Sequence, residues 1–363
     1  MSKVVTFGEI MGRLAPPGFL RLPQAMPGSL DVTFAGAEAN VAASLSILGL
    51  DAHFVTALPN NPIADACVNS LRSIGIDTSS ILRSDIGRLG LYFLETGANQ
   101  RPSRVIYDRD GSTIGQTPAD AYDWDKIFVG ADWFHVTGIT PAVSQVAAEA
   151  TLHAAKAAKQ RGLTVSCDLN FRGKLWRWDS SASPHELAGR TMRQLLPLVD
   201  VLIANEEDCG DVLQIRAAET DVASGKLSAE RYPEVARRVV QEFPNLRYVA
   251  TTLRESISAS HNNWGAMLYD AAAESASFAP RSDGEYEPYS IRNIVDRVGG
   301  GDSFAAGLIF GLLNDDYPTP QAALQFAVAA SCLAHSIIGD LNFSSREEID
   351  ALAKGSASGR VVR

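Results

Sequence analysis

Four short apolar runs decide the fold of this chain: WFHVTG (133–138), LTVSCDLN (163–170), DVLIAN (200–205) and LRYVATT (246–252). Each run has the length of a buried β-strand. A stretch of helical length, residues 143–160, lies between the first two runs. Strand and helix in alternation predict βαβ units, and therefore a parallel sheet that helices cover on both faces.

The region before these runs has a different composition and hydrophobic pattern. Residues 11–34 are rich in proline and glycine, and two segments within about 88–108 alternate like an antiparallel hairpin. We therefore predict one α/β domain over residues 1–352, with the segments 11–34 and 88–108 forming β-structure that protrudes from it. Residues 353–363 read AKGSASGRVVR, and we predict a frayed C-terminal tail there.

Composition narrows the class of protein. The 363 residues carry a formal net charge of −10. An acidic balance argues against nucleic acid or an anionic membrane as the main partner. No apolar run approaches the roughly 20 residues of a membrane span, and the four cysteines lack zinc spacing. We therefore predict a cytoplasmic protein that acts on a small molecule.

Polar residues end several of the predicted core strands. In parallel α/β sheets, ligands bind beyond the carboxyl ends of the strands. Asn170 follows the run 163–169, Asn205 follows 201–204, and Thr252 ends the last run. These three side chains are therefore candidates for one common site.

The strongest local motif reads DRVGGGDSFAAGLIFGLL, residues 296–313. Glycines allow the backbone to approach a ligand closely, and the helix start behind them offers free N–H groups. Gly299, Gly300 and Gly301 therefore predict an anion hole for phosphate. Asp302 suits a general base that takes a proton from an attacking hydroxyl. The alternative is an ordinary glycine turn in which Asp302 only caps the helix.

Two other nucleotide signatures are missing from the sequence. It contains no G-x-x-x-x-G-K-[ST] loop, so a P-loop enzyme is not indicated. It also lacks G-x-G-x-x-G after a first strand, which disfavours a nicotinamide dehydrogenase.

The glycine motif resembles the C-terminal signature of ribokinase-like (PfkB) carbohydrate kinases, D-x-x-G-A-G-D-x-F-x-x-G. It is met by Asp296, Gly299, Gly301, Asp302, Phe304 and Gly307, with Gly300 where the family usually has alanine. The N-terminal signature G-G-x-x-x-N-x-A is met by Gly36, Asn40 and Ala42, with Ala35 in place of its first glycine. The two signatures stand in the expected order at opposite ends of the chain.

This resemblance implies a three-layer α/β/α sandwich with a mostly parallel central sheet and a small protruding β-sheet lid. It implies ATP and Mg²⁺ as cofactors and leaves open a monovalent cation such as K⁺. It also implies a homodimer formed through the lid, with a sugar or sugar acid as substrate.

Several blocks, among them RVIYDRDGS and CDLNFRGKLW, are similar to 2-keto-3-deoxygluconate kinases within this family. The similarity implies a substrate pocket formed with Asp302 by Gly36, Asn40, Tyr92, Tyr107, Arg109, Asn170 and Arg172. Arginine matches a carboxylate bidentately, so two pocket arginines favour a sugar acid over a neutral sugar. The alternative for either arginine is a solvated ion pair at the surface.

The resemblance also implies residues for the nucleotide and the metal. The nucleotide would be bound by Asn205, Thr252, Arg254, Gly299, Gly301 and Ala329. Glu207 and Asp208, in the family's N-x-x-E motif, would act on Mg²⁺ through water, although Asp208 stands where the family has glutamate. The segment after Thr252 is interpreted as a long loop.

Two alternatives stay open at this point. One is a fructokinase or ribokinase of the same family, and the other is a catalytically silent sugar-binding protein on the same scaffold.

Overall fold

The computed structural model describes residues 2–216 and 231–355. Its centre is a nine-stranded sheet in which five consecutive pairings, from β4 to β12, are parallel. The strands, in spatial order, are β4 (Asp51–Val55), β1 (Lys3–Phe7), β9 (Trp133–Thr137), β10 (Thr164–Asp168), β11 (Val201–Ala204), β12 (Tyr248–Ser258), β13 (His261–Asp270) and β14 (Ser275–Ala279), with β17 (Tyr289–Arg292) paired to β13. The four apolar runs are β9 to β12, as predicted.

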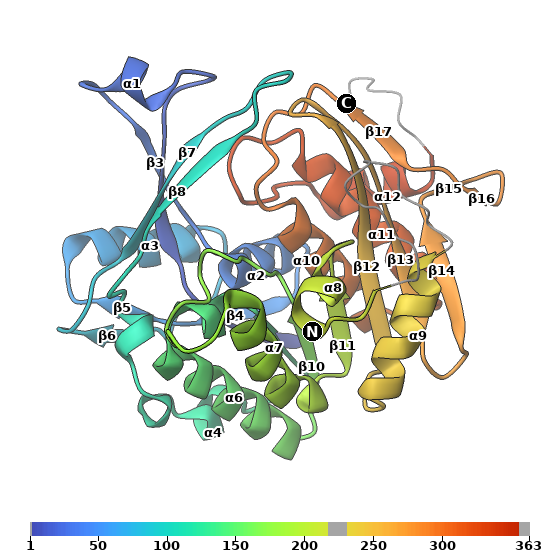
Figure 1. Ribbon diagram of the computed structural model, residues 1–363, viewed down its shortest axis with the longest axis horizontal. Helices are drawn as coiled ribbons and strands as arrows, with labels where there is room; N and C mark the ends of the chain where they lie inside the picture. Colours follow the sequence, from blue (N-terminus) through green and yellow to red (C-terminus); the bar gives the residue numbers. More distant parts are fainter. Residues whose placement is uncertain (1, 217–230, 356–363) are drawn as a thin grey trace.

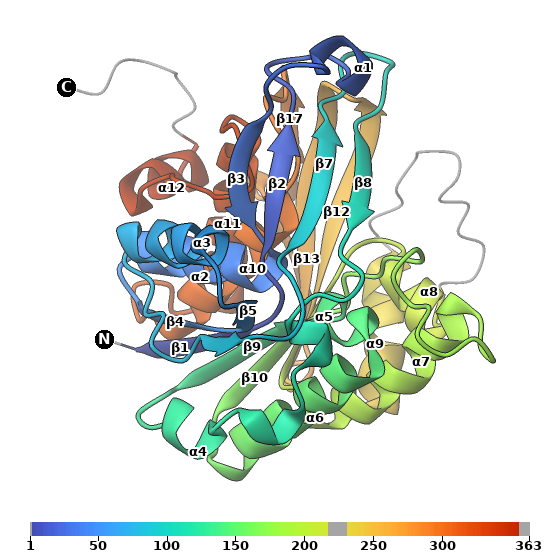
Figure 2. The same ribbon diagram turned by 90° about the vertical axis from the view of Figure 1, so that its left-hand side faces the viewer.

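Helices cover both faces of this sheet (Figures 1 and 2). One face packs against α2 (Ala37–Ile47), α3 (Pro62–Ser73), α10 (Gly300–Leu313), α11 (Pro320–Ala334) and α12 (Arg346–Ala353). The other packs against α4 (Trp124–Ile127), α5 (Ile139–Val143), α6 (Gln145–Gln160), α7 (Pro184–Leu195), α8 (Asp208–Leu213) and α9 (Tyr232–Glu242). Each face has its own buried apolar cluster, so the three-layer α/β/α sandwich is confirmed.

A second sheet of four strands stands away from the body, with the short helix α1 (Leu22–Ala25) at its tip (Figure 2). Its order is β3 (Asp31–Ala35), β2 (Met11–Ala15), β7 (Gly90–Glu95) and β8 (Arg104–Asp108). These strands fall in the two segments predicted to protrude, and β7 pairs with β8 in antiparallel register. We call this four-stranded sheet the lid.

The segment after Thr252 differs from the prediction. It is not a loop, because β12 continues to Ser258 and returns as β13 in a long antiparallel hairpin. The hairpin meets the lid at its tip, where the Ala259 amide donates to the main-chain oxygen of Asn99 at 2.7 Å. Polar residues such as Arg254 and Glu255 obscured this strand in the sequence, because its outer half leaves the apolar core.

The remaining elements are short. They are the strands β5 (Ala57–Pro59), β6 (Leu82–Ser84), β15 (Arg281–Ser282) and β16 (Glu285–Tyr286), and the 3-10 turns Ile114–Gln116, Ala119–Ala121 and Leu196–Leu198. Most of the predicted tail, residues 356–363, lies outside the described residues. Within the described ranges, no helix combines the length and the apolar character needed to cross a bilayer.

Candidate active site

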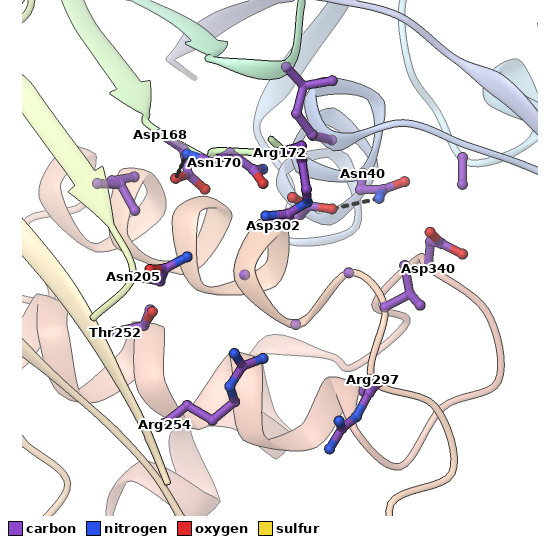
Figure 3. A pocket seen from close by; sticks show the side chains of 18 of the residues that line it. Asn40, Asp168, Asn170, Arg172, Asn205, Thr252, Arg254, Arg297, Asp302 and Asp340 are labelled. Carbon is purple, nitrogen blue, oxygen red and sulfur yellow. Dashed lines mark hydrogen bonds between the residues drawn. The ribbon is translucent and has the colours of Figure 1, made fainter. Parts of the chain in front are cut away.

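A cavity of about 330 Å³ opens at the carboxyl ends of the central strands. Residues from the lid, from the ends of β10 to β12, from the β12–β13 hairpin and from the start of α10 line it. Figure 3 shows the polar side chains that converge there. The position agrees with the rule for open parallel sheets.

The glycine loop, residues 299–301, forms one wall of the cavity. Gly299 has φ of +84°, and a Cβ there would lie 2.1 Å from the main-chain oxygen of Asp340, so only glycine fits. A Cβ on Gly301 would meet nothing within 4 Å, because this residue faces open space. The loop therefore brings bare backbone and the N-terminus of α10 to the cavity, an arrangement that binds anions.

Gly300 stands where the family signature usually has alanine, and it lies close to a neighbouring side chain. A Cβ on Gly300 would lie 3.0 Å from Cε1 of the buried His335 ring. His335 packs against Trp264 with ring centroids 5.2 Å apart, and its Nδ1 lies 2.8 Å from the main-chain oxygen of Ser331. An alanine side chain would therefore require the histidine ring to shift by a few tenths of an ångström, whereas glycine avoids this contact and keeps the loop amides.

Asp302 lies in the first turn of α10 and reaches the cavity. Its Oδ2 accepts a hydrogen bond of 2.7 Å from the Asn40 side-chain amide (Figure 3). Burial raises the pKa of Asp302 to about 7; the Asn40 hydrogen bond and the charge of Arg172 oppose the shift, whereas Asp340 and Glu38 add to it. A base with a pKa near neutrality is well matched to proton abstraction at physiological pH.

Most of the predicted substrate residues line this cavity. They are Gly36, Asn40, Tyr92, Tyr107, Asn170 and Arg172. Gly36 begins α2, and its amide donates to Asn40 Oδ1 at 3.2 Å, which orients the side chain that contacts Asp302. The Arg172 side chain lies next to Asp302 in Figure 3. It therefore offers a cation to a substrate on the Asp302 side of the cavity.

Arg109 is placed differently from the prediction. It does not line this cavity, and its guanidinium forms a buried ion pair with Glu9. The lid strand β8 ends at Asp108, and the Arg109 guanidinium lies over the Tyr107 ring, 5.6 Å from its centroid, while Glu9 neutralises its charge. Its Nε has no hydrogen-bond partner among the described residues.

Two arginines line the side of the cavity opposite Asp302. Arg254 was predicted, whereas Arg297, one residue after the signature Asp296, was missed (Figure 3). Burial lowers the pKa of Arg297, and the charge of Arg254 lowers it further. Arg297 Nε is buried and has no partner within the described part of the chain. Two cations that face each other in this way fit the phosphates of a nucleotide.

Carboxylates form a third group at the cavity: Asp168, Glu206 and Asp208. Burial raises the pKa of Asp168 well above its ordinary value, and Asp208 and Asp302 add to the shift. The Glu206 Oε2 atom is buried without a partner in the described ranges. No three metal-ligating side chains converge on one point in the described ranges, so these carboxylates fit only an ion such as Mg²⁺ that keeps several of its waters.

The two predicted metal residues have different positions. Asp208 is buried, and its two oxygens accept the amides of Phe171 at 3.2 Å and Asn205 at 3.0 Å. Glu207 is exposed and does not line the cavity, whereas its neighbour Glu206 does. The turn after Asn205 therefore directs the preceding glutamate, not Glu207, towards the site.

Of the other residues predicted to bind the nucleotide, some line the cavity and one does not. Asn205 and Thr252 line the cavity. Ala329 does not, because it is fully buried in the core face of α11. His335, after the end of α11, reaches the cavity in its place together with Trp264 of β13.

Comparison with known proteins agrees with this geometry. Residues 1–238 match the model of the pfkB family of carbohydrate kinases. The chain is 30% identical to a 2-dehydro-3-deoxygalactonokinase of Haloferax volcanii, over 99% of this chain and 98% of the relative. It is 28% identical to a 2-dehydro-3-deoxygluconokinase of Bacillus subtilis, over 95% and 93% of the two chains.

A solved structure extends the match. The crystal structure of 2-dehydro-3-deoxygluconokinase from Thermotoga maritima is 46% identical, covers 98% of this chain and 100% of its own, and superposes with a TM-score of 0.88. Residues of both family signatures lie together in one cavity, Gly36 and Asn40 from the first and Gly299–Gly301 with Asp302 from the second. The chain therefore belongs to the pfkB family of carbohydrate kinases.

Proposed function

We propose that this kinase transfers the γ-phosphoryl group of ATP to the 6-hydroxyl of 2-keto-3-deoxygluconate. One observation carries the proposal: Arg172 and Asp302 share the substrate side of one cavity, so a cation for a carboxylate lies with a base for a hydroxyl. The relatives that carry keto-deoxy sugar acids in their names support the same substrate class.

Asp302 supplies the chemistry on the substrate side. As the substrate hydroxyl oxygen bonds to the γ-phosphorus, the bond from phosphorus to the bridging oxygen of ADP breaks, and the hydroxyl proton passes to the Asp302 carboxylate. Asn40 holds that carboxylate in place through its 2.7 Å hydrogen bond. The lid residues Tyr92 and Tyr107 cover the sugar and exclude water, which limits hydrolysis of ATP.

The glycine loop and the arginine pair act on the nucleotide. Membership of this family implies ATP and Mg²⁺. The Gly299–Gly301 amides stabilise charge on the transferred phosphoryl group, and Arg254 and Arg297 hold the other phosphates. Glu206 and Asp168 would hold Mg²⁺ through water, and the ion would neutralise phosphate charge.

An ADP-release assay tests this function. The panel holds Mg·ATP with 2-keto-3-deoxygluconate, its C4 epimer 2-keto-3-deoxygalactonate, fructose, ribose, or buffer alone. We expect turnover with the keto-deoxy acids, fastest with 2-keto-3-deoxygluconate. Faster turnover of the epimer would show that 2-keto-3-deoxygalactonate is the substrate. A preference for fructose or ribose would refute the role of Arg172 in binding a carboxylate. No turnover with any sugar would favour a catalytically silent sugar-binding protein.

We also propose a homodimer formed through the lid. Apolar side chains are exposed on the lid and on the α1 connection at its tip, among them Phe19, Met26 and Val32, and in the described ranges its outer strands β3 and β8 pair with no further strand. Light scattering after size exclusion tests this proposal, because a monomer at working concentration would contradict it.

Two smaller proposals concern the cation and the compartment. A stimulation by K⁺ is tested by replacing it with tetramethylammonium at equal ionic strength. A cytoplasmic location is supported by the four free cysteines.

A further inference from the structure

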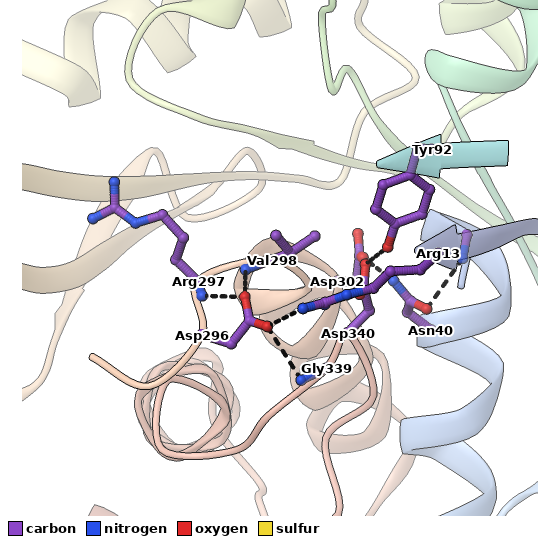
Figure 4. Close-up of polar contacts among 10 residues, drawn as sticks. Arg13, Asn40, Tyr92, Asp296, Arg297, Val298, Asp302, Gly339 and Asp340 are labelled. Atoms are coloured by element: carbon purple, nitrogen blue, oxygen red, sulfur yellow. Dashed lines mark hydrogen bonds and ion pairs between the residues drawn. The ribbon is translucent and has the colours of Figure 1, made fainter. Parts of the chain in front are cut away.

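A lid arginine lies between two carboxylates beside the glycine loop (Figure 4). Arg13 comes from strand β2, and only 4% of its surface is exposed. One guanidinium nitrogen donates to Asp296 and the other to Asp340. The arginine therefore bridges the lid and two separate segments of the C-terminal half of the chain.

These two carboxylates fix the course of the backbone that leads into the glycine loop. Asp296 Oδ1 accepts the amides of Arg297 at 2.8 Å and Val298 at 3.2 Å, and its Oδ2 accepts the amide of Gly339 at 3.2 Å. The main-chain oxygen of Asp340 packs against Gly299 so closely that no Cβ fits between them. The position of the loop therefore depends on the distance between Asp296 and Asp340.

Charge makes this arrangement depend on Arg13. Both carboxylates are buried, with 5% of Asp296 and 7% of Asp340 exposed. Burial raises the pKa of Asp340, and Arg13 opposes that shift. Without the guanidinium, two buried carboxylates would face each other uncompensated, which is strongly unfavourable. They would separate or take up water, and the loop between them would move.

The same cluster contacts the substrate side of the cavity. Tyr92 of β7 lines the cavity, and its hydroxyl donates to Asp340 Oδ2 at 2.7 Å. A sugar that binds against Tyr92 therefore contacts the side chain that holds Asp340, the same carboxylate that Arg13 binds. The lid therefore meets the segments that flank the phosphoryl-binding loop through three side-chain hydrogen bonds, two from Arg13 and one from Tyr92, and through the packing of Val298 against the lid.

We propose that Arg13 is a positioning residue: it holds the Gly299–Gly301 amides in register for phosphoryl transfer and couples their position to the lid. It does not touch the reacting atoms. The proposal rests on the proposed function, in which those amides bind the transferred group.

Steady-state kinetics of Arg13→Ala give the first test. We expect kcat to fall roughly 10²-fold, the scale of losing a preorganised donor at an oxyanion, with a higher KM for ATP. Arg88→Ala is the matched control, because Arg88 forms an exposed ion pair with Asp108 at the base of the same lid. We expect this control to keep wild-type kinetics.

Two further measurements separate positioning from general damage. Guanidinium chloride at low, non-denaturing concentration should restore part of the turnover of Arg13→Ala, whereas equal sodium chloride should not. Hydrogen exchange in the peptide spanning residues 294–304 should be faster in Arg13→Ala than in wild type and unchanged in Arg88→Ala. Exchange needs no substrate, so it decides this proposal even if the proposed substrate is wrong.

Wild-type kcat in Arg13→Ala would overturn the proposal. So would an equal loss in both variants, or a loss with unchanged loop exchange that guanidinium does not restore. Should Arg13→Ala fail to fold, Arg13→Lys carries the same test, because lysine keeps the charge but lacks the fork that reaches two carboxylates. We then expect a smaller loss of kcat and faster loop exchange.

Discussion

The side-chain amide of Asn40 donates a 2.7 Å hydrogen bond to the carboxylate of Asp302, joining residues 262 positions apart in the chain. Asn40 lies in the first half of α2, and Asp302 lies in the first turn of α10. The bond stabilises the ionised form of a carboxylate that burial otherwise pushes towards neutrality. Asn40 therefore lowers the pKa of the proposed base, Asp302, in addition to lining the sugar pocket.

The first prediction concerns the pH dependence of turnover. Asp302 must be ionised to accept a proton, so kcat/KM should rise with pH through a midpoint near 7. Asp340 and Glu38 raise the pKa of Asp302, whereas Asn40 and Arg172 lower it. Asn40→Ala removes a lowering contact, so its midpoint should lie at higher pH. A pH–rate profile checks this, and an unchanged or lower midpoint would contradict it.

The second prediction concerns stability. The pKa of Asp302 is raised from 3.8 to about 7 in the fold, so ionisation disfavours the folded state increasingly between these values and constantly above them. Asp302→Asn removes that penalty. It should be more stable than wild type at pH 8 by roughly 2 kcal/mol, after allowance for residual solvent contact, and should gain little at pH 4.

Thermal melts at the two pH values measure this difference. Asp120→Asn, at an exposed carboxylate, is the control and should show no such pH-dependent gain. An Asp302→Asn variant that is less stable than wild type at pH 8 would show that the carboxylate supports the fold.

The third prediction separates two neighbouring glycines. A Cβ on Gly301 meets nothing within 4 Å, so Gly301→Ala should fold and gain roughly 0.5–1 kcal/mol of helix stability. Its methyl group would occupy phosphoryl space, so kcat should fall roughly 10²-fold. Gly299→Ala should instead destabilise the protein, because its Cβ would meet the Asp340 main chain. Melting curves and ADP release test both variants, and wild-type turnover in Gly301→Ala would place the phosphoryl group elsewhere.

The fourth prediction concerns Arg297. Its Nε is buried without a partner in the described residues, and its side chain faces the same cavity as Arg254. Arg297→Met should raise the KM for ATP roughly tenfold, the scale of one charge-assisted contact, and leave the KM for the sugar almost unchanged. Arg292→Met, at an exposed strand position, is the control. A rise in the sugar KM alone would place Arg297 on the substrate side.

The parts of the site that could be predicted from the sequence lie in contiguous motifs or at strand ends. Gly299–Gly301 and Asp302 could be predicted from the local sequence alone, because a glycine run before a helix is typical of an anion-binding site. Asn170, Asn205 and Thr252 followed from the rule on parallel strands, and all three reach the cavity.

The other residues of the site could not be predicted, because their positions depend on tertiary contacts or on the direction in which a single side chain points. Glu206 and Glu207 are adjacent acids, and only the turn after β11 decides which one faces the cavity. Asp340 follows α11 in a segment without regular pattern, so its contact with Arg13 could not be predicted. Ala329 lies on a helix whose small residues pack in the core, and small residues alone do not distinguish packing from a ligand wall.

The role of Asp302 as the base is tested most directly by the turnover of Asp302→Asn with Mg·ATP and 2-keto-3-deoxygluconate, measured by ADP release. We expect kcat to fall roughly 10²–10⁴-fold while both substrates still bind, because only the proton acceptor is lost. Turnover within about threefold of wild type would contradict it, since Asp302 would then not be the base.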